Sequence, residues 1–246
     1  MIPQRKFVIA IDGTAGTGKS TVGRVLAKNL EYGFLSSGGL YRALAYTVFA
    51  KKIDPADAQA VLNAAKELKF TFTRQADATL KMYVNGEYLG DKLNLDEVAQ
   101  TASKISTHAA ARAVLTDKMR EVGKEGGIVV EGRDIGTVVF PDAEVKIYLD
   151  ATAEVRADRR VKQLAEQGVQ ADYAQILASI KERDLRDSTR AASPLKPAKD
   201  AVIIDTSDKS QTKVVELMMW AVVDAYDARL PKTSEDDDEE SEEDDE

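Results

Sequence analysis

One glycine-rich loop constrains this chain more than any other stretch. Residues 13–20 read Gly-Thr-Ala-Gly-Thr-Gly-Lys-Ser and fit G-x-x-x-x-G-K-[ST], the phosphate-binding P-loop. The apolar run 7–11 before the loop predicts a buried strand, and the apolar residues of 22–30 after it fall at helical spacing. Because strand, loop and helix occur in this order, the motif predicts a nucleoside triphosphate site rather than a chance glycine-rich turn.

Backbone N–H groups and two side chains give this loop its chemistry. Glycines let the backbone bend around an anion, and the helix that starts near Lys19 adds the positive end of its dipole. Lys19 can reach the β- and γ-phosphates, and the Ser20 hydroxyl can bind Mg²⁺. The predicted ATP-binding residues are Gly13, Thr14, Ala15, Gly16, Thr17, Gly18, Lys19, Ser20 and Thr21, with Ser20 as the metal ligand.

Composition limits the class of protein. The chain has 246 residues, of which 43% are hydrophobic, enough for one large domain or a domain with an inserted lobe. It has no cysteine, which excludes disulfides and thiolate metal sites. No apolar stretch approaches the length of a membrane span, and the N-terminus lacks a signal-peptide pattern. We therefore expect a soluble cytoplasmic protein.

Charge is distributed unevenly along the chain. Residues 235–246 hold eleven acidic residues and one serine. Without these eleven, 31 acidic residues face 34 Lys and Arg, so the rest of the chain carries +3 although the whole carries −8. A mildly basic body suits phosphorylated ligands. A run of like charges cannot bury a core, so we expect a disordered acidic tail over 231–246, with recruitment of a basic partner as the alternative.

The rest of the chain alternates between expected strands and helices, which predicts an α/β fold with a parallel sheet. Beyond the first strand and helix, strands are expected at 34–35, 128–130, 145–149 and 201–205, and helices at 40–50, from Asp54-Pro55, over 96–122 with a break near Ser106-Thr107, from Thr152, over 176–189 and over 210–226. The segment 69–90 departs from this order. It alternates over 70–73 and 80–84, and Asn85-Gly86 predicts a hairpin turn before a strand at 87–89. We interpret it as a small antiparallel sheet in an inserted lobe.

Polar residues gather where expected strands end. Ser36-Ser37-Gly38-Gly39 joins a strand to a helix, which places hydroxyls and backbone N–H groups at a helix N-terminus, with Arg42 one turn in. Glu131, Arg133 and Asp134 follow the buried strand 128–130. Open α/β sheets bind ligands at the carboxyl ends of their strands. Both places are therefore candidate ligand sites.

A second cluster of charges lies on one face of an expected helix. Arg183, Arg186, Asp187 and Arg190 fall at i, i+3, i+4 and i+7. On an isolated helix this pattern indicates a solvated face with internal ion pairs. Beside a P-loop it favours phosphate binding, because guanidinium groups bind phosphate in a bidentate manner. The single histidine, His108, has no second ligand near it and is assigned no role.

Three motifs give a resemblance to a known family. Residues 36–42 (Ser-Ser-Gly-Gly-Leu-Tyr-Arg) resemble the [D]-S-G-x-x-Y-R segment of bacterial cytidylate kinases. Residues 131–141 resemble that family's G-R-D-[IM]-G-T-V-V-F-P signature, and 180–195 is similar to its lid and the segment after it. The motifs occur in family order from about residue 7 to 226, and the acidic tail lies outside the match.

The resemblance implies an ATP- and Mg²⁺-dependent kinase that phosphorylates CMP or dCMP to CDP or dCDP. It also implies a P-loop kinase fold with a five-stranded parallel sheet, a helical lid, and an inserted monophosphate-binding lobe that carries a small antiparallel sheet. We therefore expect a single kinase domain over 1–230, with the lobe at about 54–122 and the lid at about 152–196. A monomer is expected, with a small-molecule substrate and with neither nucleic acid nor membrane as partner.

Site residues carry over by position. The predicted catalytic cations are Lys19 of the P-loop and the arginines that the resemblance implies, Arg133, Arg183 and Arg190. The resemblance also implies contacts to the acceptor nucleotide. The residues of this substrate-binding set are Ser37, Arg42, Ser103, Arg112, Arg133, Asp134, Arg183, Asp187 and Arg190. Within it, Ser103 and Asp187 resemble groups that read the cytosine and the sugar, Arg112 a base contact, and Asp134 a cytosine or sugar contact. Arg159, Arg160 and Arg186 are weaker lid candidates.

The chain departs from the family pattern at two positions. Ser36 stands where the family usually has aspartate, and Asn94 where it often has arginine. The first puts a sugar or Arg42 contact in question, and the second a phosphate contact.

Two acidic residues, Asp12 and Glu131, each follow an apolar strand and are candidates to assist Mg²⁺. The alternative for each is a charge held by a neighbouring arginine.

Phosphoryl transfer between two polyanions needs alignment and charge neutralisation more than a general base, because the acceptor phosphate is already ionised near neutral pH. Closure of the arginine helix would exclude water and limit ATP hydrolysis.

Two other functions stay open. One is a P-loop kinase for UMP or a small metabolite. The other is a nucleotide-binding switch with the acidic tail as a docking arm, although no guanine-reading N-K-x-D segment occurs.

Overall fold

The computed structural model describes residues 6–228, so the expected acidic tail lies outside the described residues. A five-stranded sheet forms the centre of the molecule, with strand order β2-β5-β1-β6-β7 and every pairing parallel. The strands are β1 (Val8–Gly13), β2 (Gly33–Ser36), β5 (Ile128–Glu131), β6 (Val145–Asp150) and β7 (Val202–Asp205). The predicted α/β fold with a five-stranded parallel sheet is confirmed.

Alternating side chains bury both faces of this sheet. In β1, Ile9 and Ile11 pack with α1 (Lys19–Asn29) and α8 (Gln211–Asp227), whereas Ala10 faces the opposite side. Ala10 there meets a second apolar cluster that includes Leu35, Leu40 and Val130. Burial on both faces explains why the central strands β1 and β5 are continuous apolar runs rather than alternating ones.

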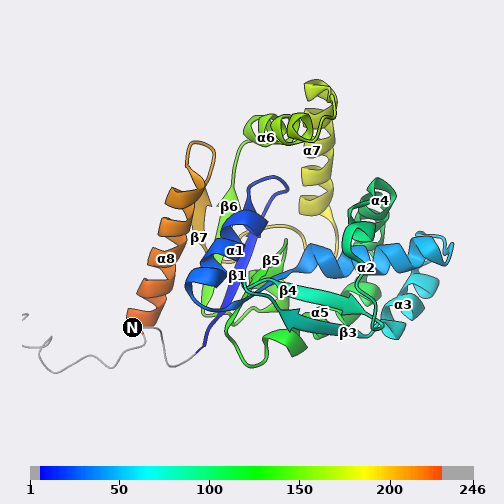
Figure 1. Cartoon of the computed structure of the whole chain (residues 1–246), viewed down its shortest axis with the longest axis horizontal. Helices are drawn as coiled ribbons and strands as arrows, with labels where there is room; N and C mark the ends of the chain where they lie inside the picture. The colour runs from blue at the N-terminus through cyan, green and yellow to red at the C-terminus, as the bar shows by residue number, and fades with distance from the viewer. Residues whose placement is uncertain (1–5, 229–246) are drawn as a thin grey trace, which may run out of the picture.

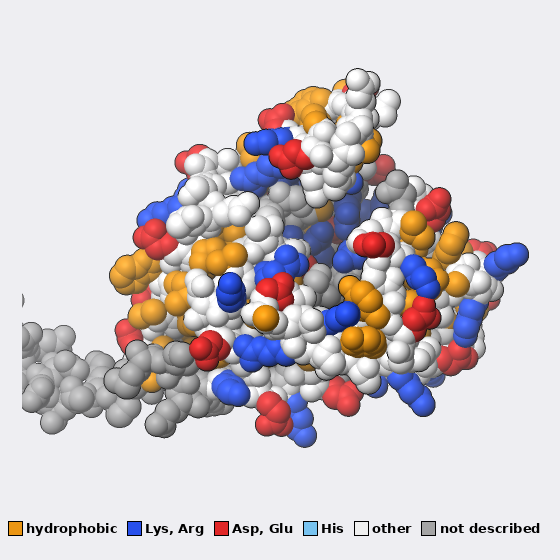
Figure 2. Space-filling view, in the orientation of Figure 1, with side chains coloured by type: hydrophobic (Ala, Val, Ile, Leu, Met, Phe, Trp, Pro, Cys, Tyr) orange, Lys and Arg blue, Asp and Glu red, His pale blue; other side chains and the backbone are white. Residues whose placement is uncertain are grey.

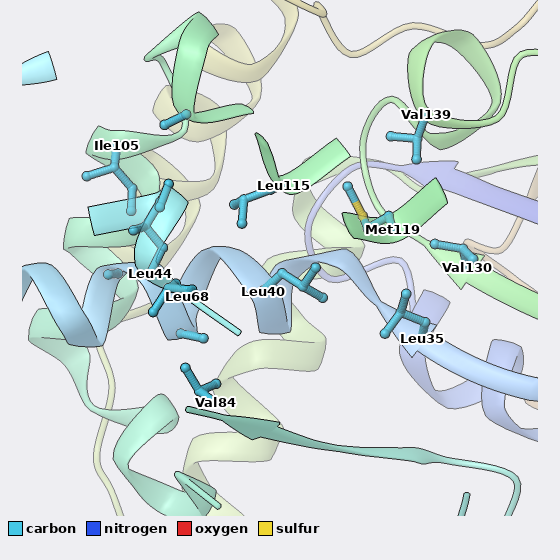
Figure 3. Packing of buried hydrophobic residues seen from close by; sticks show 14 of the residues in the cluster. Leu35, Leu40, Leu44, Leu68, Val84, Ile105, Leu115, Met119, Val130 and Val139 are labelled. Carbon is cyan, nitrogen blue, oxygen red and sulfur yellow. The ribbon is translucent and has the colours of Figure 1, made fainter. Parts of the chain in front are cut away.

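That second cluster continues into a lobe beside the sheet (Figure 1). Leu44, Leu68, Ile105, Leu115 and Met119 form its centre (Figure 3). The lobe consists of α2 (Ser37–Ala50), α3 (Ala58–Glu67), the antiparallel pair β3 (Phe70–Arg74) and β4 (Leu80–Val84), a short 3₁₀ helix (Gly90–Asn94), α4 (Asp96–Ile105) and α5 (Ala109–Gly123). The small antiparallel sheet is confirmed, as is the break between two helices near Ser106-Thr107.

Two helices stand away from the sheet and form the lid. They are α6 (Ala153–Glu166) and α7 (Tyr173–Thr189), and they pack on each other (Figure 1). No residue of α7 is buried, because its polar face looks toward the lobe across a gap rather than into a core. Figure 2 shows this hollow between lid and lobe, with Lys and Arg side chains inside it. The described residues include no helix long and apolar enough to cross a membrane.

Two local predictions are wrong. The third helix begins at Ala58 rather than at Asp54-Pro55, because Asp57 caps it by accepting from the amides of Gln59 and Ala60. The strand expected at 87–89 does not form. Asn85 and Gly86 do adopt positive φ, 51° and 84°, but the chain after them makes a single bridge, from Glu87 to Val84. The hairpin turn lies instead at 75–79, between β3 and β4.

Candidate active site

The P-loop runs from β1 to α1 at the carboxyl edge of the sheet. Gly13, Gly16 and Gly18 have φ of 146°, 85° and 88°, a region that L side chains rarely adopt. At Gly13 a side chain is also excluded by space, since an added Cβ would lie 2.0 Å from the Leu149 carbonyl oxygen. The glycines therefore set the loop's curvature, and α1 begins without a side-chain cap on its first amides.

Lys19 lies inside this loop. Its side chain is 5% exposed, and its Nζ donates to the Thr14 carbonyl and, at 3.3 Å, to Thr17 Oγ1. Burial, followed by the nearby positive charge of Arg133, lowers the pKa of Lys19 to about 7. A phosphate in the loop would restore the charge by supplying the anion that the ammonium lacks.

Arg156 supports the P-loop from the lid side, and sequence reasoning missed it. Its guanidinium is 4% exposed and donates to the Ala15 carbonyl at 3.1 Å and to the Asp184 carboxylate of α7 at 3.0 Å. Its side chain also covers Gly16, where an added Cβ would lie 3.3 Å away. Arg156 lies at helical spacing from Arg159 and Arg160, at i, i+3 and i+4, so the sequence alone places the three on one face of α6. The structure separates them, because Arg159 binds Thr206 and Arg160 binds Gln163.

Glu131 and Asp12, the two acidic candidates, are used differently. Glu131 accepts from Ser20 Oγ at 3.0 Å and is 6% exposed, so a carboxylate stands beside the predicted metal ligand. Asp12 instead accepts from the amides of Ile135 and Gly136, each at 2.7 Å. Burial raises the pKa of Asp12 to about 6. A hydroxyl and one carboxylate, completed by phosphate oxygens, suit Mg²⁺. The donor set beside Ser20 therefore fits this metal, and Glu131 is the better-placed acid.

A buried ion-pair cluster lies on the lobe side. Asp134 binds the Arg112 guanidinium, and Arg190 Nη2 lies 3.7 Å from its other oxygen. The side chains of all three are 6–7% exposed. Arg112 also lies over the Tyr41 ring, 5.3 Å from its centroid. Residues from α2, α5, the segment after β5 and the end of α7 thus meet at one point.

Asp187 on α7 links the segment after β5 to the lid. It accepts from Arg133 Nε at 3.0 Å, and Arg183 Nε lies 4.0 Å from the same oxygen. The predicted catalytic cations Arg133 and Arg183 are therefore held side by side by one carboxylate. Within the part of the chain that the structure describes, the buried polar atoms without a hydrogen-bond partner include Arg42 Nε, Arg112 Nε and Arg190 Nη2. Unpaired buried guanidinium nitrogens are costly unless an anion or acceptor completes them.

A cleft of about 970 Å³ lies between α4 and α7. Ser103, Arg183 and Arg186 line it, and Arg186 Nη1 donates to Ser103 Oγ at 2.7 Å. Ser37 is 7% exposed at the start of α2. His108 also borders the cleft, but its Nε2 donates to the Pro55 carbonyl at 2.8 Å, a structural contact.

Tyr41 is a site residue that sequence reasoning quoted within a motif without giving it a function. Its hydroxyl is buried and, among the described residues, has no hydrogen-bond partner. Burial raises the pKa of Tyr41 to about 12. The group is therefore a neutral donor beside Arg112 and Asp134. Its position in the motif was visible, but the direction of its side chain depends on tertiary packing.

Fold and site together define the class of protein. A parallel sheet with a P-loop after its first strand, a helical lid and a cluster of arginines between lid and lobe are the parts of a P-loop kinase. The family model described as "Cytidylate kinase" matches residues 9–224, and the chain belongs to that family.

Curated relatives agree with this membership. A cytidylate kinase of Pasteurella multocida is 43% identical over 212 residues, covering 85% of this chain and 92% of that protein. One of Mycolicibacterium paratuberculosis is 45% identical over 210 residues, with the same coverage. A solved shikimate kinase from Bacteroides thetaiotaomicron is similar over 90% of this chain and 98% of its own, at 12% identity and with a TM-score of 0.44.

Proposed function

We propose that this protein transfers the γ-phosphoryl group of ATP to CMP or dCMP and releases ADP and CDP or dCDP. One observation carries the proposal beyond family membership. Guanidinium groups from separate segments converge between the P-loop and the lobe, and the buried nitrogens Arg42 Nε, Arg112 Nε and Arg190 Nη2 lack a hydrogen-bond partner among the described residues. Asp134 and Asp187 satisfy only part of this cluster, and further acceptors would satisfy the remaining nitrogens. A nucleoside monophosphate beside a bound triphosphate supplies such acceptors.

The chemistry follows from this placement of charge. The acceptor phosphate is a weak nucleophile that must approach another polyanion, and it needs no deprotonation near neutral pH. Lys19 serves the transferring group from the P-loop side, and Arg133 and Arg183 serve it from the side of Asp187. These cations stabilise the transition state, in which charge spreads over the transferring oxygens.

Ser20 would hold Mg²⁺, with Glu131 beside it. When bound, the metal neutralises charge on the β- and γ-phosphates of ATP and aligns them. The protein itself fixes the triphosphate through the loop amides, the α1 N-terminus and Lys19, and it excludes water by closing the lid over the cleft.

Acceptor recognition is proposed for the lobe side of the cleft. Ser37 and Arg42, at the start of α2, would bind the monophosphate. The Arg112–Asp134 pair offers one donor group and one acceptor group to a base edge, and Ser103 and Asp187 would complete the contacts to base and sugar. In this arrangement residues 54–122 act together with α2 as the monophosphate-binding lobe, and 152–196 act as the lid, of one kinase domain spanning 1–230.

An acceptor panel tests the proposal. ADP release is measured with ATP and Mg²⁺ in the presence of CMP, dCMP, UMP, AMP or no acceptor. We expect release with CMP and dCMP and little with the others. Release that favoured UMP would indicate a different monophosphate kinase. Release that did not depend on any acceptor would indicate a nucleotide-hydrolysing switch.

A further inference from the structure

Ser36 and Glu131 form a hydrogen bond that joins the lobe to the P-loop. The two residues lie opposite each other at the ends of β2 and β5. Ser36 Oγ donates to Glu131 Oε1 at 2.5 Å, and Ser20 Oγ donates to the same oxygen at 3.0 Å. Two hydroxyls therefore fix one oxygen of a buried carboxylate. No group among the described residues donates to its other oxygen, Oε2.

The hydroxyl of Ser36 bonds to Glu131 instead of capping α2, the helix that Ser36 precedes. Ser36 is the N-cap residue of α2, where a serine side chain ordinarily accepts from an amide of the first helical turn. It makes no such bond. Ser210 shows the ordinary behaviour at the start of α8, where its Oγ accepts from the Lys213 amide at 3.2 Å. Ser36 is thus turned away from its own helix and toward the P-loop.

Few other acidic side chains could take the place of Glu131 beside the metal. Asp12 is engaged by two backbone amides. Among residues 6–228, no group of three or more Asp, Glu, His or Cys side chains could hold a metal ion. Mg²⁺ dehydrates reluctantly and is commonly bound through one or two carboxylates and substrate phosphates. With a single well-placed carboxylate, the orientation of that group decides how well the metal is held.

We propose that Ser36 is a positioning residue for the metal. Its hydroxyl orients Glu131 beside Ser20 for the Mg²⁺ that binds with the nucleotide, and it leaves the first amides of α2 uncapped for the acceptor phosphate. The inference rests on the proposed function, since it assumes a nucleotide in the P-loop. It predicts that removal of this hydroxyl weakens metal-dependent nucleotide binding and leaves metal-independent binding unchanged.

Calorimetric titration with ADP, once with Mg²⁺ and once with EDTA, tests this directly. For Ser36→Ala we expect the Kd for ADP to rise roughly tenfold in Mg²⁺, as for other residues that orient metal-binding groups, and to be unchanged in EDTA. Ser36→Thr keeps the hydroxyl and should restore binding in Mg²⁺. Ser210→Ala is the matched control, because it removes a true helix cap. It should lower the melting temperature and leave both Kd values unchanged.

Three other results would overturn either this inference or the proposed function. Equal Kd values for wild type and Ser36→Ala in Mg²⁺ would overturn the inference. A loss of the same size in Mg²⁺ and in EDTA would also overturn it, because Ser36 would then act on the nucleotide or the fold rather than on the metal. Wild-type protein that bound no ADP in either condition would instead overturn the proposed function, which separates the two failures.

Discussion

The P-loop, which we propose binds ATP, and the arginine cluster between lid and lobe, which we propose binds the acceptor nucleotide, are built in opposite ways. We call them the donor half and the acceptor half of the site. The P-loop is one continuous segment whose shape comes from glycines with positive φ and whose Lys19 bonds within the loop. The acceptor half is assembled from α2, α5, the end of β5 and α7, and it is held by ion pairs between residues as far apart as Arg133 and Asp187. The first half is local in sequence, whereas the second exists only when lobe, sheet and lid are in place.

Lys19→Ala tests the donor half and should have the largest effect. Phosphoryl transfer should fall by roughly 10³-fold or more, because the cation acts mainly on charge that develops in the transition state. Steady-state kinetics with CMP would measure the loss. Transfer within tenfold of wild type would contradict the assignment of Lys19.

Arg183→Ala tests the acceptor half at a half-exposed side chain. We expect turnover to fall by roughly 10²-fold, since one charge-stabilising donor is removed. Binding of ATP, followed by calorimetry, should be nearly unchanged, in contrast to a change in the P-loop. Normal turnover of CMP by this variant would show that the arginine face of α7 is only a solvated surface.

Arg112→Met tests how far the acceptor half is also structural. It leaves the buried Asp134 without its closest cation, so the protein should lose about 3 kcal/mol of its free energy of unfolding, partly offset by Arg190. Urea denaturation would measure this. Lys118→Ala, at an exposed pair with Glu121, is the control and should cost less than about 0.5 kcal/mol. Equal losses in the two variants would contradict a buried pair.

Proton uptake on nucleotide binding should be the smallest effect that distinguishes the donor half from the acceptor half. The pKa of Lys19 is about 7 without ligand, so above that pH the amine is largely neutral. A bound polyphosphate raises this pKa, so nucleotide binding at pH 8 takes up a proton and affinity falls as pH rises above about 7. Calorimetry in two buffers of different ionisation enthalpy would detect up to one proton, absent in Lys19→Met. Equal heats in both buffers would contradict it.

The same contrast explains what could be predicted from sequence. The P-loop, the positions of the strands along the chain and the helix that carries Arg183 were predictable because each depends on residues within one segment. The start of α3 was misplaced because Asp54-Pro55 and Asp57 both suit a helix N-terminus, and only Asp57 makes the capping bonds. Arg156 and Tyr41 were missed as site residues because their partners, Ala15 and Asp184 for one and Arg112 for the other, lie far along the chain.

Ser36 shows most clearly what cannot be predicted from the sequence. The resemblance marks Ser36 as a departure from the family pattern, and its position between a strand and a helix predicts a helix cap. Neither indicates that its hydroxyl bonds to Glu131, because that contact requires β2 and β5 to be neighbours in the sheet. The functional consequence of such a residue can be inferred only after the topology is known.

Transfer of the labelled γ-phosphoryl group tests the central claim most directly. ATP carrying ³²P at the γ-position is incubated with the protein, Mg²⁺ and CMP or dCMP, and the products are separated by chromatography. The account predicts that the label appears in CDP or dCDP and that almost none is released without an acceptor. Label released as inorganic phosphate at the same rate with and without CMP would contradict it.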